Sequence, residues 1–193
     1  MSFMIWRPGS QTDGICKVLD VQNIEDSFEL LTGVSRLAGW PEDALCAMDP
    51  SFPKDIELAD SLFGAGVLLI SGKVRGLLEG LGVNRVEFLP VRIVNHKGRT
   101  ASKDYFIANP LDICDCIDEQ QSETKRNPIA PECILKSKRL VLQDDKVPAD
   151  HKVFRPELWR DLVLVRRELA EAMNAANLSG LRFVEPLKYK GYG

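Results

Sequence analysis

The chain has 193 residues, of which 45% are hydrophobic and 27% charged, with 25 basic against 28 acidic side chains. Low hydrophobicity combined with a high net charge is the signature of disorder, and this composition excludes disorder as the dominant state. The longest apolar stretch, residues 64–70, is far shorter than the roughly 20 residues that a membrane-spanning helix needs. We expect a folded protein of one domain, or of two small lobes that share a core.

The first 57 residues predict an irregular N-terminal segment, 1–57, with short strands and a helix. Residues 1–6 and 15–21 are each typical of a short strand. The pattern over residues 27–37 favours a helix. Three prolines then break the chain, so that residues 40–57 are predicted to form a loop over the surface.

From residue 58 onward the hydrophobic pattern becomes regular, and we assign residues 58–193 to an α+β domain. The apolar run at 67–70 predicts a buried strand. Ser71 can cap a helix that follows directly. The apolar residues of this helix recur at helical spacing and are Val74, Leu77, Leu78 and Leu81. Further strands are expected at 86–93 and from residue 105, joined by a polar turn.

A second strand–helix–strand pattern follows near the C-terminus, after a polar stretch at 119–133 that we expect to be an exposed loop. Residues 162–165 form an apolar run, residues 169–176 repeat the helical spacing, and residues 181–183 begin another strand. At a constant offset of 95 residues, eight apolar positions of the two patterns match. Two explanations stay open: an internal pseudo-repeat, or the periodicity that any such unit has. The expected fold class is α+β, with two similar strand–helix–strand units around a mostly antiparallel or mixed sheet.

Acidic charge is concentrated in two segments. Residues 20–60 contain ten acidic and two basic residues, and residues 104–124 contain six acidic residues and no basic one. A nucleic-acid-binding protein shows a basic stripe instead. Nucleic acid is therefore not the expected partner, and a basic protein is favoured.

The densest acidic stretch supplies the candidate partner-binding residues, which are Asp112, Asp115, Asp118, Glu119 and Glu123. Carboxylates at this density are also suited to acid–base chemistry or to holding a cation, although the glycine-containing calcium-loop pattern is absent. A third interpretation is a solvated strand edge that its charge protects from pairing with another chain.

Other chemical motifs are not matched. A phosphate-binding loop would need a hydroxyl residue where Val74 stands, and His96 and His151 are both expected in solvated loops. We therefore assign no catalytic residue and no cofactor. The five cysteines are expected to be free and structural. Cys114 and Cys116 would share one strand face, but zinc would need two further ligands, so no metal is expected.

Four short phrases carry a resemblance to a known family. They are Leu-Leu-Ile-Ser-Gly-Lys-Val-Arg-Gly-Leu-Leu at 68–78, Val-Glu-Phe-Leu-Pro-Val at 86–91, Ile-Asp-Glu at 117–119 and Leu-Ser-Gly-Leu-Arg-Phe at 178–183. Through them, residues 58–185 resemble a bacterial family of immunity proteins from polymorphic toxin systems, the MXAN-type immunity domain. The resemblance implies a protein without enzymatic activity that binds and neutralises a cognate toxin, blocking its active site or its access to substrate.

A nuclease toxin would be complementary in charge to the acidic segments, because an enzyme that binds phosphates presents Lys and Arg around its active site. Two alternatives from other classes stay open: a small hydrolase or transferase that uses the acidic cluster, and an adaptor protein of a secretion system. The first residues lack a secretory signal pattern, so we expect a cytoplasmic protein that binds neither membranes nor nucleic acid.

Overall fold

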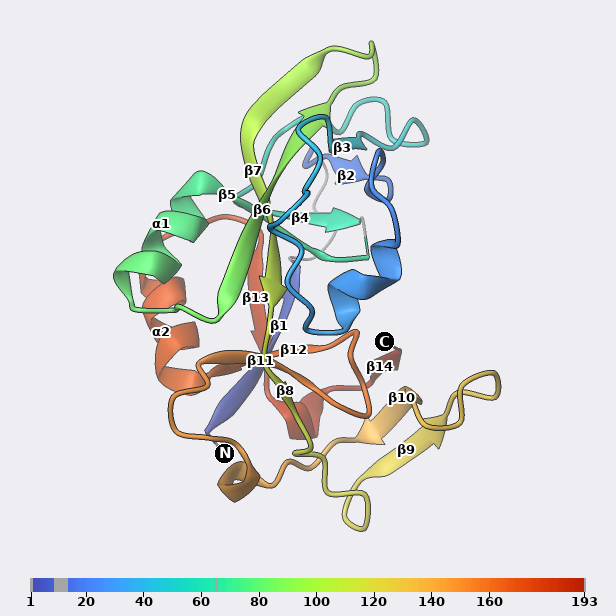
Figure 1. The fold of residues 1–193 in the computed structure, drawn as a ribbon, viewed down its shortest axis with the longest axis vertical. Helices are drawn as coiled ribbons and strands as arrows, with labels where there is room; N and C mark the ends of the chain where they lie inside the picture. Colours follow the sequence, from blue (N-terminus) through green and yellow to red (C-terminus); the bar gives the residue numbers. More distant parts are fainter. Residues whose placement is uncertain (1, 9–13, 65, 193) are drawn as a thin grey trace.

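The computed structural model describes residues 2–8, 14–64 and 66–192, and within these residues the strands form three sheets (Figure 1). The six-stranded sheet has the order β2 (Lys17–Val18), β4 (Ser61–Gly64), β5 (Leu68–Ser71), β7 (Thr100–Pro110), β6 (Val86–Val94) and β3 (Leu45–Ala47). The five-stranded sheet has the order β13 (Leu181–Val184), β1 (Phe3–Pro8), β12 (Val163–Arg166), β11 (Val153–Pro156) and β8 (Ile113–Cys114). The three-stranded sheet has the order β14 (Gly191–Tyr192), β10 (Ile134–Arg139) and β9 (Glu123–Arg126). The α-helices are α1 (Gly72–Gly80) and α2 (Arg167–Ala175), and the 3-10 helices are η1 (Ser27–Leu31), η2 (Asp144–Lys146) and η3 (Pro186–Lys188).

Each α-helix lies in a unit of the same architecture. Both helices begin at the residue directly after a strand, β5 or β12, and both are followed by a strand, β6 or β13. β7 lies between β5 and β6 and is antiparallel to both, and β1 lies in the same way between β12 and β13. One row of residues paired across the three strands is Leu68, Ala108 and Phe88 in the first unit, and one such row in the second unit is Val163, Trp6 and Phe183. The strand–helix–strand units and the mixed sheets confirm the predicted α+β fold class.

A central core joins the two units. Val74 and Leu78 are buried on α1, and Leu169 and Met173 are buried on α2, because residues four apart share one face of a helix. In Figure 1 the two helices lie next to each other on one side of the large sheets. Side chains from both large sheets complete this core, including Trp6, Ile70, Val86, Ala108, Val153 and Val165. Among the described residues, no helix is long and apolar enough to cross a membrane.

The N-terminal segment takes part in both large sheets. β1 is an inner strand of the five-stranded sheet, and β2 and β3 are the edge strands of the six-stranded sheet. The helix predicted over residues 27–37 is wrong beyond Leu31, because Gly33 adopts a φ of 74° and the chain then runs along the sheet. The loop predicted over 40–57 contains β3, which pairs in parallel with β6, and the loop predicted over 119–133 contains β9.

Asp60 links the two units through hydrogen bonds from two serines. Its carboxylate accepts bonds from the Ser71 hydroxyl (2.8 Å), the Ser179 N–H (2.9 Å) and the Ser179 hydroxyl (3.0 Å). Ser179 precedes β13, and the next residue, Gly180, has a φ of 72°. A Cβ atom on Gly180 would lie 2.1 Å from the carbonyl oxygen of Ser61, so glycine is needed for this close approach. Residues in two of the family-like phrases therefore hold the two units together.

We expect Asp60→Asn to reduce the sensitivity of the fold to acid. Burial alone would raise the pKa of Asp60, but the hydrogen bonds from Ser179 and Ser71 and the charge of Lys73 lower it below its usual value. A lowered pKa in the folded state stabilises the protein above the unfolded-state pKa of about 3.9, and this stabilisation is lost as the pH falls through the folded-state value.

Urea unfolding curves measured from pH 6 down to pH 2 test this expectation. The free energy of unfolding should fall less with pH for Asp60→Asn than for the wild type. Asp26→Asn, at an exposed position, is the control and should behave as the wild type does. An unchanged pH dependence in Asp60→Asn would show that this carboxylate does not contribute.

Candidate partner-binding surface

The five candidate residues lie in the acidic segment, residues 111–123, and they face in two directions. Asp112 is 3% exposed and Asp118 is 9% exposed, because both side chains turn into the protein. Asp115, Glu119 and Glu123 are exposed along the chain that leaves β8 and enters β9. A partner can therefore reach only the last three carboxylates directly.

Asp112, which is buried, is the centre of a polar cluster that reaches the surface at Arg85. Arg85 donates a hydrogen bond from Nε to Asp112 Oδ1, and His151 Nε2 lies 3.6 Å from the same oxygen. The other ring nitrogen of His151, Nδ1, lies 3.3 Å from Cys114 Sγ. His151 lies in a loop, as predicted, but its side chain is partly buried instead of solvated, because β11 pairs with β8 and brings the loop before β11 against the acidic segment.

A catalytic site with a thiol nucleophile uses the residue types that meet here, Cys114, His151 and Asp112. Such a nucleophile needs a neighbouring base and access to substrate. Cys114 is only 5% exposed. Burial, together with the charge of Asp112, raises the pKa of the Cys114 thiol to about 11, so that the thiol is protonated near neutral pH. Within the described residues, no group of three or more His, Cys, Asp or Glu is placed to hold a metal ion. The cluster fixes the acidic segment to the loop before β11.

We expect a thiol reagent to modify the native protein rapidly at Cys133 alone. The five cysteines are free; Cys133 is partly exposed, and the buried ones are Cys16, Cys46, Cys114 and Cys116. Burial raises the pKa of Cys16 to about 11 and that of Cys46 and Cys116 to about 12, so little thiolate forms. A titration without reductant should give one fast thiol in native buffer and all five after denaturation. Fast labelling of Cys114 in the folded protein would instead indicate an activated nucleophile.

Asp118 stabilises a turn. Its Oδ1 accepts hydrogen bonds from the backbone N–H groups of Gln120 and Gln121, both at 3.0 Å, and its Oδ2 accepts one from Gln121 Nε2 at 2.7 Å. The bond from the Gln121 backbone is the main reason why the pKa of Asp118 lies below its usual value. Asp118 is thus a residue of the fold, and it sets the direction in which the chain enters β9.

The exposed carboxylates make only weak internal contacts. Asp115 lies 3.3 Å from Lys146 Nζ, and Glu119 pairs with Arg126. Exposed ion pairs of this kind contribute about 0–1 kcal/mol. A basic partner can therefore replace Lys146 and Arg126 at little cost. For Glu123, no ion pair is present among the described residues.

A cavity of the described region lies away from the acidic segment. It has a volume of about 720 Å³ and is lined by residues of β1, β5 and β11, among them Trp6, Leu68 and Arg155. Arg155 is buried, and burial lowers its pKa to about 10, so the guanidinium stays charged near neutral pH. Asp161 lies on the same lining. None of the described lining residues belongs to the acidic segment.

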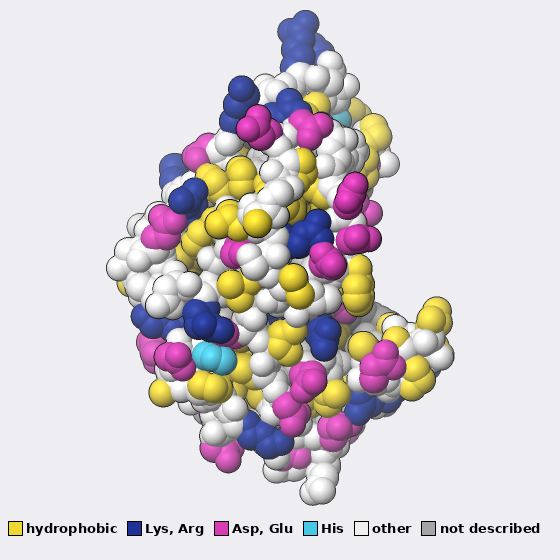
Figure 2. All heavy atoms as spheres, in the orientation of Figure 1, with side chains coloured by type: hydrophobic (Ala, Val, Ile, Leu, Met, Phe, Trp, Pro, Cys, Tyr) yellow, Lys and Arg dark blue, Asp and Glu magenta, His cyan; other side chains and the backbone are white. Residues whose placement is uncertain are grey.

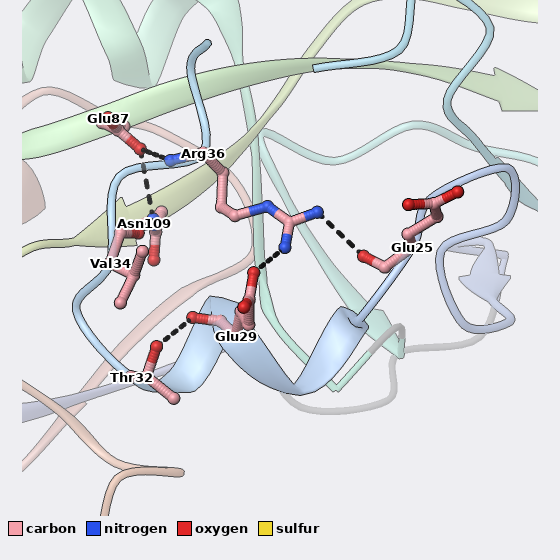
Figure 3. A network of polar contacts seen from close by, with 7 residues as sticks. All are labelled: Glu25, Glu29, Thr32, Val34, Arg36, Glu87 and Asn109. Atoms are coloured by element: carbon pink, nitrogen blue, oxygen red, sulfur yellow. Dashed lines mark hydrogen bonds and ion pairs between the residues drawn. The ribbon is translucent and has the colours of Figure 1, made fainter. Parts of the chain in front are cut away.

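A second surface feature follows η1 and was missed by the sequence analysis (Figure 3). Glu87 of β6 accepts hydrogen bonds from the backbone N–H of Arg36 (2.9 Å) and from Asn109 Nδ2 (3.3 Å). Asn109 of β7, fully buried, also donates to the carbonyl oxygen of Val34 (3.1 Å). These bonds hold the chain after η1 against the six-stranded sheet.

The same chain is tied back to η1 by one guanidinium. The side chain of Arg36 pairs with Glu29 of η1 and donates to the carbonyl oxygen of Glu25 (2.8 Å). Thr32 closes the end of η1 by donating from its hydroxyl to the Glu29 carbonyl oxygen (2.7 Å). The acidic charge of residues 20–60 was the sequence signal that pointed to this region, but it did not reveal the ordered loop.

Comparison with known families identifies the class of protein. Residues 13–187 match the model of the immunity protein family Imm11. The match covers most of the chain, and the chain therefore belongs to the Imm11 immunity protein family. A search of curated proteins found no match. The family gives the chain a role in immunity to a protein toxin and confirms the resemblance inferred from the four sequence phrases.

The match extends further towards the N-terminus than the resemblance at 58–185. It begins at residue 13 and so includes β2, η1 and β3. These elements form both edges of the six-stranded sheet and the ordered loop beside it. The family match thus includes both the acidic segment and the region around η1.

Proposed function

We propose that this protein binds a cognate nuclease toxin and neutralises it by covering the basic surface on which the toxin holds nucleic acid. The observation that supports the proposal most directly is the exposed row of Asp115, Glu119 and Glu123 in a member of an immunity protein family. A nuclease must present Lys and Arg to the phosphates of its substrate. An acidic protein surface can occupy the same place.

The proposal assigns the protein no catalytic step. The Cys114 thiol is buried and protonated near neutral pH, and Asp112 is paired with Arg85. The rival class, a hydrolase or transferase that uses the acidic cluster, would need these carboxylates in a cavity. The described cavity is lined by other residues. We further propose that the complex forms in the cytoplasm of the producing cell or its siblings.

Titration of nuclease activity tests the proposed function. The probe is a purified nuclease toxin domain that co-purifies with this protein, assayed on a DNA or RNA substrate. Inhibition should be immediate and complete at a fixed molar ratio, and co-production of both proteins should restore growth. Inhibition that grows with time at substoichiometric amounts would indicate an enzyme acting on the toxin. An absence of both binding and rescue would contradict the proposal.

A further inference from the structure

We propose that the toxin is anchored on a second patch, the η1 surface, which consists of the apolar residues Phe28, Val34 and Leu37 and the acidic residues Glu25, Asp26, Glu42 and Asp43. This inference rests on the proposed function and names the part of the interface that holds the toxin. The partner patch on the toxin is apolar at its centre and basic at its rim.

The apolar side chains of the η1 surface are exposed to solvent. Phe28 is 70% exposed, Leu37 is 61% exposed and Val34 is half-exposed. Single apolar side chains on a surface need no explanation, but a cluster of large ones indicates an interaction site. Here three lie within ten residues, and Arg36 holds the chain that carries Val34 and Leu37 against η1, which carries Phe28. Figure 2 shows apolar and acidic side chains side by side where η1 lies in Figure 1.

The backbone that carries Val34 and Leu37 is held by hydrogen bonds to the six-stranded sheet. Glu87 and Asn109, both from inner strands of the six-stranded sheet, fix the backbone at Val34 and Arg36. Gly33 packs so closely on the residue that follows β7 that a Cβ atom there would lie 2.8 Å from the carbonyl oxygen of Leu111. The apolar side chains are therefore presented on a backbone that is already ordered. Binding through a preorganised surface costs less conformational entropy than binding that must first order a loose loop.

The charge around the apolar residues of the η1 surface decides what kind of partner covers it. Residues 25–43 contain five acidic residues and one basic residue, Arg36. The side chain of Arg36 already forms an ion pair with Glu29 within the protein. For Glu25, Asp26, Glu42 and Asp43 no ion pair is present among the described residues, and all four are exposed. A rim of this sign favours a basic partner.

The η1 surface lies beside the acidic segment. A Cβ atom on Gly33 would also lie 3.1 Å from Cγ1 of Ile113, so the loop after η1 adjoins the start of the acidic segment. One basic protein can therefore contact both. The apolar residues would contribute most of the binding free energy, and the carboxylates would attract and orient the partner.

Binding measurements with truncated side chains test the inference. Phe28→Ala combined with Leu37→Ala should raise the dissociation constant for the toxin domain about 30-fold or more, mainly through faster dissociation. Ile129→Ala is the matched control, because Ile129 is 93% exposed and lies in the turn between β9 and β10. Its affinity should equal that of the wild type, and all variants should keep the wild-type melting temperature.

The outcomes separate this inference from the proposed function. If the wild type binds the toxin and the double variant binds equally well, the η1 surface is wrong while the proposed function stands. If the wild type does not bind, both fail. Hydrogen exchange of the unmodified complex gives a second test that needs no variant: amides of residues 25–43 should gain protection on binding. Unchanged exchange there would overturn the anchor even if the double variant were poorly folded.

Discussion

Replacing Leu78 by alanine is expected to lower the free energy of unfolding by about 3 kcal/mol. Leu78 is fully buried in the central core, where α1 and α2 meet side chains from both large sheets. The substitution removes three buried carbon atoms and leaves a cavity that the surrounding strands cannot close without moving. Because the core is shared by the two units, we expect a single cooperative transition that shifts as a whole.

Urea unfolding of the two proteins provides the measurement, and Leu37→Ala provides a control with the same chemical change. Leu37 is exposed, so its truncation should alter the free energy of unfolding by less than about 0.5 kcal/mol. The assignment of Leu78 to the core would be wrong if both variants lost the same small amount. Two separate transitions in Leu78→Ala would show that the units fold independently.

Periodicity was sufficient to locate both helices, because each buries residues four apart on one face: Val74 and Leu78 on α1, and Leu169 and Met173 on α2. The order of the strands could not be predicted in this way. β7 lies between β5 and β6 although it follows both in the chain, and β1 lies between β12 and β13 although it precedes both. Local hydrophobic patterns contain no information on such long-range pairing.

The acidic charge of residues 104–124 could be counted from the sequence, but its orientation could not. Asp112 is paired with Arg85, 27 residues earlier in the chain, and Asp118 is satisfied by N–H groups of its own turn. The sequence contained a signal for the role of Asp118, since an aspartate followed by polar residues is typical of a turn closed by its own carboxylate. It contained no signal for the role of Asp112, because only the fold brings Arg85 and His151 to this residue.

The negative charge of the exposed carboxylates in the acidic segment is expected to accelerate association with the toxin. Reversal of Asp115, Glu119 and Glu123 to lysine should slow association with the toxin about tenfold or more at low salt. Asp118 is left unchanged, because it stabilises the turn through its hydrogen bonds. The difference from wild type should shrink as the ionic strength approaches about 0.5 M, where the screening length falls to about 4 Å.

A matched control separates the effect of charge in the acidic segment from the effect of the protein's net charge. Reversal of Glu79, Glu168 and Glu171, which are exposed on α1 and α2, changes the net charge of the protein by the same amount at another place. Stopped-flow association rates should then fall only for the variant in the acidic segment, while both variants keep the wild-type melting temperature within a few degrees. Equal slowing would mean that the toxin responds to net charge alone. A wild-type rate in both would remove the acidic segment from the interface, and the toxin would then be held by the η1 surface without electrostatic help from residues 111–123.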